Sequence, residues 1–244
     1  MSLRLIDRPS PNFGDRKIAQ PSILVLHYTG MPDAASALAR LCDPSANVSA
    51  HYSIDEDGTV YRHVGEDKRA WHAGVAYWRG IRDVNSASIG IELVNPGHDC
   101  GYRAFPGTQI DALTELAHDI LTRHRIAAHD VVGHSDIAPG RKRDPGEMFP
   151  WRELAERGIG FWPASRGGAP MSVDQDAVWA MLSSIGYATP ISSDRGGDIL
   201  GPDGPAGVIK SVQMHYRPGR IDGVMDTETA QIIAELAAEN GAIA

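Results

Sequence analysis

Residues able to hold a metal ion are concentrated between residues 134 and 146 of the chain. The segment is His134-Ser-Asp-Ile-Ala-Pro-Gly-Arg-Lys-Arg-Asp-Pro-Gly146, in which Asp144 follows the histidine after a loop containing Pro and Gly. A third candidate, His27, ends an apolar run. Two imidazoles and one carboxylate, with water in the fourth position, are a common catalytic zinc shell, and such a zinc lowers the pKa of its water to roughly 7. Since the chain contains ten His, these three predict a Zn²⁺ site only if the fold joins them.

Glu92 is a second candidate for chemistry, because it interrupts the apolar segment Ile89-Gly-Ile-Glu-Leu-Val94. An ionised carboxylate is costly to bury without a partner. Next to a zinc site it could take the proton during attack by water and return it to the leaving nitrogen. The alternative is a residue on the exposed face of a sheet. Lys142 precedes Asp144 by two residues and could stabilise a developing oxyanion, although a basic run such as residues 141–143 is usually a solvated loop.

Aromatic residues follow in the segment Ala70-Trp-His-Ala-Gly74, with Trp78 and Arg79 nearby in the sequence. Trp71 and His72 suit stacking on a sugar or peptide while donating hydrogen bonds. The alternative is that Trp71 and Trp78 fill the core, and composition does not separate the two.

The elements that must position these residues alternate between strands and one long helix. Residues 108–125 have helical apolar spacing with Thr108 as N-cap, residues 1–20 form an arm over the first domain, and residues 135–150 form a loop. Strands are predicted at residues 22–28, 50–54, 59–63, 89–94 and 130–133, with Asp57-Gly58 as a hairpin turn. This pattern predicts an α/β fold, a mixed central β-sheet flanked by helices.

A second, smaller domain is predicted after a linker. Residues 163–170 contain no bulky apolar side chain, and helical segments follow at residues 172–185, 206–216 and 227–240. The predicted organisation is a catalytic domain over residues 1–162, the linker over 163–170, and a small three-helix bundle over 171–244.

Composition excludes several classes of function. The 244 residues carry 23 Lys and Arg against 31 Asp and Glu, a net charge of −8, which argues against nucleic-acid binding by bulk charge. No apolar run approaches the ~18 residues of a membrane span, and no signal peptide or lipid-attachment cysteine is visible, so a cytoplasmic location is expected, or a periplasmic one if a leader has been removed. For Cys42 and Cys100, free buried thiols are favoured over a disulfide.

Five ordered motifs between about residue 22 and residue 159 resemble those of the type 2 N-acetylmuramoyl-L-alanine amidases. These AmiD/AmpD-like zinc amidases are related to phage lysozyme-amidases and peptidoglycan recognition proteins. The motifs are Leu26-His27-Tyr-Thr, Val48-Ser-Ala-His-Tyr52 with the Asp57-Gly58 turn, Ala70-Trp-His-Ala-Gly74, Ser88-Ile-Gly-Ile-Glu-Leu-Val-Asn95 and Gly133-His-Ser-Asp-Ile-Ala-Pro-Gly-Arg-Lys-Arg-Asp-Pro145. The C-terminal part resembles a peptidoglycan-binding type 1 domain through residues 212–218 and 222–229.

The resemblance implies a role for each candidate residue. It places zinc on His27, His134 and Asp144, makes Glu92 the general base and acid and Lys142 the stabiliser of the tetrahedral intermediate, and leaves Trp71, His72 and Asn95 as candidates for substrate binding. Where some relatives carry a catalytic Tyr, this chain has Ala50, so the proton transfers fall to Glu92.

The implied reaction is hydrolysis of the amide between the lactyl group of N-acetylmuramic acid, or its anhydro form, and L-Ala of the stem peptide. The substrate is accordingly peptidoglycan or a muropeptide. Two alternatives stay open: a non-catalytic peptidoglycan-recognition module with structural zinc, and a zinc peptidase that cuts within the stem peptide. The oligomeric state is left open as well.

Overall fold

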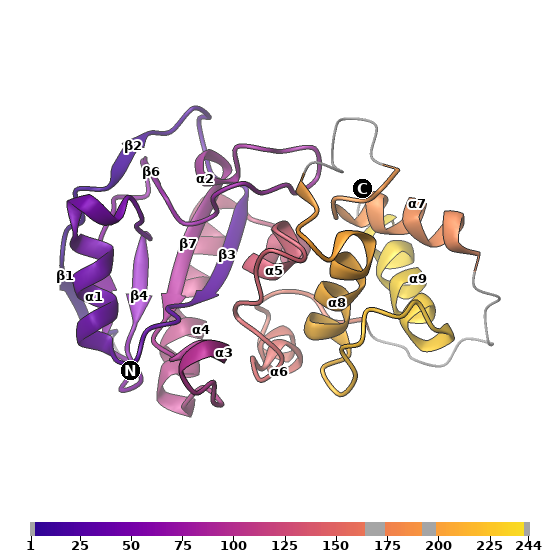
Figure 1. Cartoon of the computed structure of the whole chain (residues 1–244). Helices are drawn as coiled ribbons and strands as arrows, with labels where there is room; N and C mark the ends of the chain where they lie inside the picture. The colour runs from indigo at the N-terminus through magenta and orange to yellow at the C-terminus, as the bar shows by residue number, and fades with distance from the viewer. Residues whose placement is uncertain (1–2, 164–173, 192–198, 242–244) are drawn as a thin grey trace.

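The computed structural model describes residues 3–163, 174–191 and 199–241, and Figure 1 shows their arrangement. A β-sheet with its flanking helices forms one side of the molecule, and three C-terminal helices stand beside it, next to α5 and α6 (Figure 1). The predicted α/β fold with a mixed central sheet flanked by helices is confirmed.

The central sheet has six strands in the order β1-β5-β4-β7-β3-β8. Only β4 and β5 pair antiparallel, and the other neighbours are parallel. The strands are β1 Leu5–Asp7, β3 Ile23–Tyr28, β4 Tyr52–Ile54, β5 Val60–Arg62, β7 Ser88–Leu93 and β8 Val131–Gly133.

Alternation along β3 divides its side chains between two cores. Leu24 and Leu26 pack into the core under α4 (Gly107–His124), whereas Ile23 and Val25 pack into a second core shared with the C-terminal helices. Because both faces are covered, the strand is apolar on both sides, as the unbroken apolar run predicts. His27 has the same parity as Ile23 and Val25, so it projects from the face opposite α4.

The predicted hairpin is confirmed. Residue Ile54 pairs with Val60 across β4 and β5, and the Gly58 N–H donates to Asp55 O over 2.9 Å. Gly58 has φ +84°, and a Cβ there would lie 2.9 Å from the Thr108 carbonyl oxygen, so both conformation and space require glycine.

Three sequence predictions need correction in this part of the chain. The N-terminal arm does not only lie over the first domain: it contributes the strand β1 to the central sheet, and its strand β2 (Phe13–Asp15) pairs with β6 (Lys68–Ala70). Strands of three residues are too short to show a recognisable alternation of apolar and polar residues. Thr108 is not the N-cap: α4 begins at Gly107 after Pro106, and the Thr108 hydroxyl donates instead to Glu56 O over 2.7 Å. The predicted loop after residue 134 begins with a helical turn, α5 (His134–Ile137).

The remaining helices near the sheet are short. They are α1 Ala34–Cys42, α2 Val84–Ala87, α3 Gly97–Cys100, α6 Trp151–Glu156 and two 3-10 turns, Pro44–Ala46 and Ala128–Asp130. Cys42, in α1, is half-buried and Cys100 is exposed. Both thiols are free as predicted, but the expectation that they are buried is wrong, because each lies at the end of a surface helix.

The C-terminal part contains α7 (Gln175–Ile185), α8 (Gly204–Tyr216) and α9 (Thr227–Gly241), the three helices predicted. Their apolar residues Val178, Val208 and Ile233 share one core with Val25 and Ile137 of the sheet-containing part. The predicted linker lies, after Pro163, outside the described residues, as does the predicted helix start at residue 172, so the domain boundaries stay predictions.

Among the residues that the structure describes, no helix is both long and apolar enough to cross a membrane.

Candidate active site

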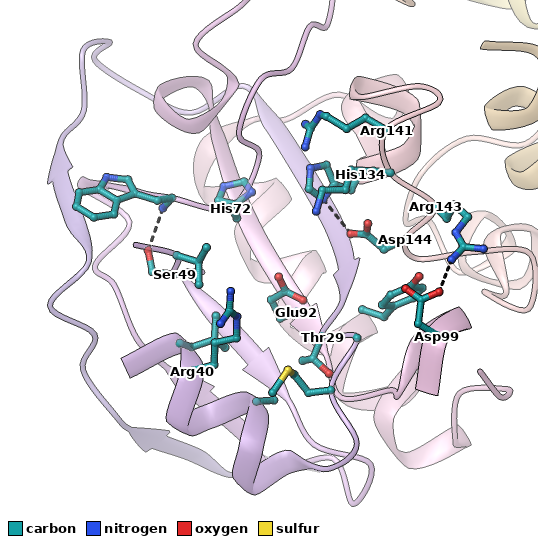
Figure 2. A pocket seen from close by; sticks show the side chains of 18 residues that line it. Thr29, Arg40, Ser49, His72, Glu92, Asp99, His134, Arg141, Arg143 and Asp144 are labelled. Carbon is teal, nitrogen blue, oxygen red and sulfur yellow. Dashed lines mark hydrogen bonds and ion pairs between the residues drawn. The ribbon is translucent and has the colours of Figure 1, made fainter. Parts of the chain in front are cut away.

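The three predicted metal ligands come from the carboxyl ends of two neighbouring strands. His27 lies near the end of β3, and His134 directly follows β8. Asp144 lies in the loop after α5, which continues from the end of β8. Because β3 and β8 pair in parallel, their ends meet at one edge of the sheet. In Figure 2, His134 and Asp144 point toward one another beside β3.

Three side-chain atoms converge at this edge. His27 Nδ1 lies 2.9 Å from Asp144 Oδ2 and 3.0 Å from His134 Nδ1, and His134 Nδ1 lies 3.0 Å from Asp144 Oδ2. All three side chains are buried. The structure therefore brings together the three residues that the sequence offered as ligands.

A chain of hydrogen bonds determines which nitrogen of His27 carries its proton. The Ser88 hydroxyl has one hydrogen and donates it to Val84 O over 2.6 Å, so Ser88 Oγ must accept from His72 Nε2, 3.2 Å away. His72 Nδ1 is then an acceptor and takes the hydrogen of His27 Nε2 over 3.0 Å. Burial, with His134 next to it, lowers the pKa of His27 to about 4, so the ring is neutral. His27 Nδ1 accordingly presents a lone pair to the cluster.

The same argument applies to His134. Its Nε2 lies 3.0 Å from the carbonyl oxygen of Ala73, which can only accept, so Nε2 carries a hydrogen, and in the neutral ring Nδ1 presents a lone pair. Two lone pairs and a carboxylate oxygen thus face one another at about 3 Å, an arrangement that is repulsive unless a cation lies between them. This donor set fits a metal ion, and the cluster of His27, His134 and Asp144 can hold one.

Glu92 lies on β7 opposite His27 in the parallel register, so the two side chains project from the same face of the sheet. Its Oε2 is buried and has no hydrogen-bond partner among the described residues. Burial, reinforced by the charge of Asp144, raises the pKa of Glu92 well above its ordinary value. The alternative of an exposed sheet position is therefore wrong: Glu92 lines a cavity of ≈ 390 Å³ next to the ligand cluster (Figure 2).

Of the three basic side chains at residues 141–143, two have hydrogen-bond or ion-pair partners among the described residues and one has none. Arg141 donates to Ala73 O over 2.9 Å, and Arg143 pairs with Asp99 over 2.8 Å. The Lys142 side chain lines the cavity, half-buried, and makes no hydrogen bond or ion pair with any residue in the described part of the chain. The charge of Lys142 lowers the pKa of Glu92, against burial and Asp144, which raise it, so the two groups lie close enough to interact.

The three candidates for substrate binding lie in different surroundings. Trp71 lines the cavity and is half-buried. His72 also lines it, but both of its ring nitrogens are engaged, by His27 and Ser88. Asn95 is buried and bonds Arg103 O and the Gly97 N–H, which organises the turn after β7. Their contact with substrate stays a prediction. Trp78 fills core against Tyr187, as the alternative proposed.

Sequence reasoning missed two contributors to this site. Ser88 has no role that its local sequence indicates, because it acts by accepting a hydrogen bond from His72, a residue distant in the sequence. Arg40, on α1, points into the cavity (Figure 2), and its side chain has neither a hydrogen bond nor an ion pair with any described residue. It lies outside every motif, so no local signal could have identified it.

Two imidazoles and one aspartate beside a half-buried glutamic acid, at the edge of a mixed sheet, fit a metal-dependent hydrolase. Residues 17–147 match the Amidase_2 family, N-acetylmuramoyl-L-alanine amidase. The chain is 40% identical over 233 residues to N-acetylmuramoyl-L-alanine amidase AmiD of Escherichia coli K12, covering 87% of this chain and 80% of that protein. It belongs to the N-acetylmuramoyl-L-alanine amidase family.

Solved structures resemble nearly the whole chain. E. coli AmiD in complex with the substrate anhydro-N-acetylmuramic acid-L-Ala-D-gamma-Glu-L-Lys has a TM-score of 0.77 at 39% identity, covering 91% of both chains. Pseudomonas aeruginosa AmpDh3 in complex with anhydromuramic pentapeptide has a TM-score of 0.78 at 34% identity, covering 95% of both. The 1,6-anhydro-N-acetylmuramyl-L-alanine amidase AmpD of Citrobacter freundii is 36% identical, over 59% of this chain and 84% of that protein.

Proposed function

We propose that this chain is a zinc-dependent amidase that hydrolyses the bond between the lactyl group of N-acetylmuramic acid, or its anhydro form, and L-Ala of the stem peptide. The observation that carries the proposal is the convergence of His27 Nδ1, His134 Nδ1 and Asp144 Oδ2 beside a half-buried glutamic acid whose pKa is raised. Membership of the amidase family supports the bond that is cut. The complexes of AmiD and AmpDh3 with anhydro-muropeptides support the substrate class.

Zn²⁺ suits the ligand set, because two imidazole nitrogens and one carboxylate oxygen are a frequent catalytic zinc shell. When bound, zinc supplies a Lewis acid that polarises a carbonyl and lowers the pKa of water. His27 and His134 would bind it through Nδ1, each held in the required tautomer by its other nitrogen.

Glu92 is proposed to move the proton. It faces the same cavity as the ligands, with an oxygen that no described residue engages. In its ionised form it would accept a proton from the attacking water and then deliver it to the nitrogen of L-Ala, which leaves as an amine. A cation among the ligands would offset the charge of Asp144, one of the two causes that raise the Glu92 pKa. The pKa of Glu92 would then be lower, which favours the ionised carboxylate that can accept a proton.

Lys142 is proposed to stabilise the negative charge that develops on the carbonyl oxygen of the substrate. Its ammonium group lines the cavity without a partner among the described residues, so it is free to interact with that oxygen.

Mass spectrometry of digested muropeptide distinguishes this proposal from its alternatives. The zinc-loaded chain is incubated with anhydro-muropeptide and, in parallel, with intact sacculi. Release of a stem peptide with a free L-Ala amino group supports the amidase. Binding to sacculi without release would identify a recognition module, and cleavage inside the stem with an intact lactyl amide would identify a peptidase. A comparison of the two substrates also shows whether polymer or soluble fragment is preferred. The cytoplasmic location expected from the sequence stays a prediction.

A further inference from the structure

The loop that carries His134, Lys142 and Asp144 is tied together at its two ends. We call residues 133–145 the ligand loop. The Ser135 N–H donates to Asp144 O over 2.9 Å, so the backbones beside two of the metal ligands are joined directly. A displacement of α5 at one end of the ligand loop would therefore move Asp144 at the other.

Asp136, in the middle of α5, is a buried carboxylate bonded by three donors. Its Oδ2 accepts from the Gly133 N–H and from His215 Nδ1, each over 2.8 Å. Its Oδ1 accepts from the Tyr187 hydroxyl, also over 2.8 Å. Only 1% of Asp136 is exposed, so these donors replace the water that a carboxylate needs. Two of the three come from the C-terminal part of the chain.

Helix α8 presents one face to the ligand loop. Ser211 and His215 are four residues apart and lie on the same side of the helix. The Ser211 hydroxyl lies 2.8 Å from Ser135 O, within reach to donate. The His215 ring is stacked between Trp151 and Tyr216, at centroid distances of 3.8 and 3.9 Å, which fixes the direction of its Nδ1.

Backbone also meets backbone at this contact. A Cβ added at Gly201 would lie 2.4 Å from the Gly140 carbonyl carbon, and one at Gly207 would lie 2.8 Å from Gly140 Cα. The Gly201 N–H donates to Pro139 O over 2.9 Å. The approach is possible only because these positions lack side chains, so the C-terminal part fits the ligand loop closely in shape as well as in hydrogen bonding.

We propose that the C-terminal helices are part of the active-site scaffold, and that Tyr187, Ser211 and His215 are positioning residues for the metal ligands. They act through Ser135 and Asp136, which directly follow His134 in the sequence and in α5. The inference rests on the metal centre of the proposed function. The match to the family model ends at residue 147, before α7 begins, so Tyr187, Ser211 and His215 lie outside the residues that match it.

The test uses the full-length chain and two substitutions that preserve volume, Tyr187→Phe and Ser211→Ala, separately and together. Zinc affinity is measured by competition with a chelating dye, and the coordination geometry by the visible absorption spectrum of the Co²⁺-substituted protein. We expect the double variant to bind zinc about 10- to 100-fold more weakly, the usual effect of losing outer-shell support, and to show an altered Co²⁺ spectrum. Its kcat should fall more than its KM rises, because the substrate contacts remain.

Thr229→Val is the matched control. Thr229 is fully buried in α9, and its Oγ1 accepts from Gln213 and Arg217, both within the C-terminal part. The variant should lower the midpoint of thermal unfolding while leaving zinc affinity and the Co²⁺ spectrum unchanged. This separates positioning of the ligand loop from general loss of stability.

Two results would overturn the inference. In the first, the double variant binds zinc with an affinity within twofold of that of the unmutated chain and shows the same Co²⁺ spectrum. In the second, Thr229→Val loses as much zinc affinity as the double variant. The proposed function fails separately, if the unmutated chain binds zinc but releases no stem peptide. In that case the affinity and spectral measurements still decide whether the C-terminal helices position the ligands.

Discussion

Glu92 can accept a proton but is not one of the candidate metal ligands, so its substitution tests catalysis separately from metal binding. Glu92→Gln keeps the size of the side chain and removes its ability to accept a proton. We expect kcat to fall about 10²- to 10⁴-fold, the usual contribution of general acid–base catalysis. Zinc content should stay at one ion per chain, because Glu92 is outside the ligand cluster. The rate of stem-peptide release and the bound metal are measured on the same sample. An unchanged rate would remove Glu92 from the mechanism.

The raised pKa of Glu92 also predicts an effect on stability in the metal-free chain. Its folded-state pKa lies well above the ordinary value of 4.5, so the unfolded chain loses this proton at lower pH than the folded one. The stabilising contribution is present below about pH 4.5 and is lost as pH rises through the folded-state pKa. Glu92→Gln should therefore match the unmutated chain at pH 4 and exceed its melting temperature increasingly toward pH 8. Parallel melting curves across that range would contradict the buried, protonated glutamic acid.

Ser88 tests the hydrogen-bond chain that assigns the tautomer of His27. In Ser88→Ala the His72 Nε2–H loses its acceptor, and a His72 ring protonated at Nδ1 would force His27 to present N–H rather than a lone pair to the metal. We expect zinc affinity to fall about 10- to 100-fold. Ser53→Ala is the control, because Ser53 is equally buried and bonds His63 over 2.8 Å, away from the ligands. Equal affinity of the two variants would refute the proposed tautomer.

At the scale of elements, β7 shows how one strand serves both core and site. Ile89, Ile91 and Leu93 face the core under α4, whereas Gly90 and Glu92 face the ligand side. Gly90 leaves the space that the His72 ring occupies: a Cβ there would lie 2.5 Å from His72 Cγ. The absence of a side chain at this position is therefore part of the site.

Gly90→Ala should displace the His72 ring and weaken the hold on His27. We expect a loss of stability of about 1–3 kcal/mol, as for overpacked cores, together with weaker zinc binding. Gly107→Ala, at the open start of α4, where an added Cβ meets nothing within 4 Å, is the control and should change neither. Chemical denaturation of the metal-free variants and dye competition measure the two effects. Zinc binding at full affinity in Gly90→Ala would show that the ring position does not matter.

At the scale of the whole molecule, buried neutral histidines dominate the response to mild acid. Burial lowers the pKa of His27 to about 4, that of His51 to about 3 and that of His72 well below 6.5. Rings whose pKa is lowered by burial take up protons on unfolding in mild acid, and the lowered pKa values of His63 and His129 act in the same direction. The raised pKa of Glu92 acts in the opposite direction, because the unfolded chain releases that proton at lower pH.

The metal-free chain should accordingly lose unfolding free energy as the pH falls from 6 to 5, by about 1.4 kcal/mol per pH unit for each net proton taken up. In Glu92→Gln the opposing release from Glu92 is absent, so the slope should be steeper than in the unmutated chain, by at most about 1.4 kcal/mol per pH unit. Denaturant titrations at several pH values give both slopes. A slope near zero, or the same slope in both proteins, would contradict the burial of these groups.

The sequence by itself determined five of the six strands of the central sheet, the hairpin, the long helix and which three residues are candidates for metal ligands. Apolar runs, the Asp57-Gly58 turn and the helical spacing of residues 108–125 are local patterns whose physical meaning depends on near neighbours. The ligands could be selected because His27 and His134 each follow a strand, and strand ends gather at one edge.

Only the tertiary structure decided the tautomer of His27, the surroundings of Lys142 and the contacts of the C-terminal helices with the ligand loop. Ser88 acts through His72, Arg40 enters the cavity from α1, and His215 reaches Asp136 across 79 positions of sequence. Such contacts depend on which surfaces meet when the chain packs, and side-chain types along a segment carry no information about a partner that distant. The sequence shows which chemical groups are present, but only the folded chain brings them within bonding distance of one another.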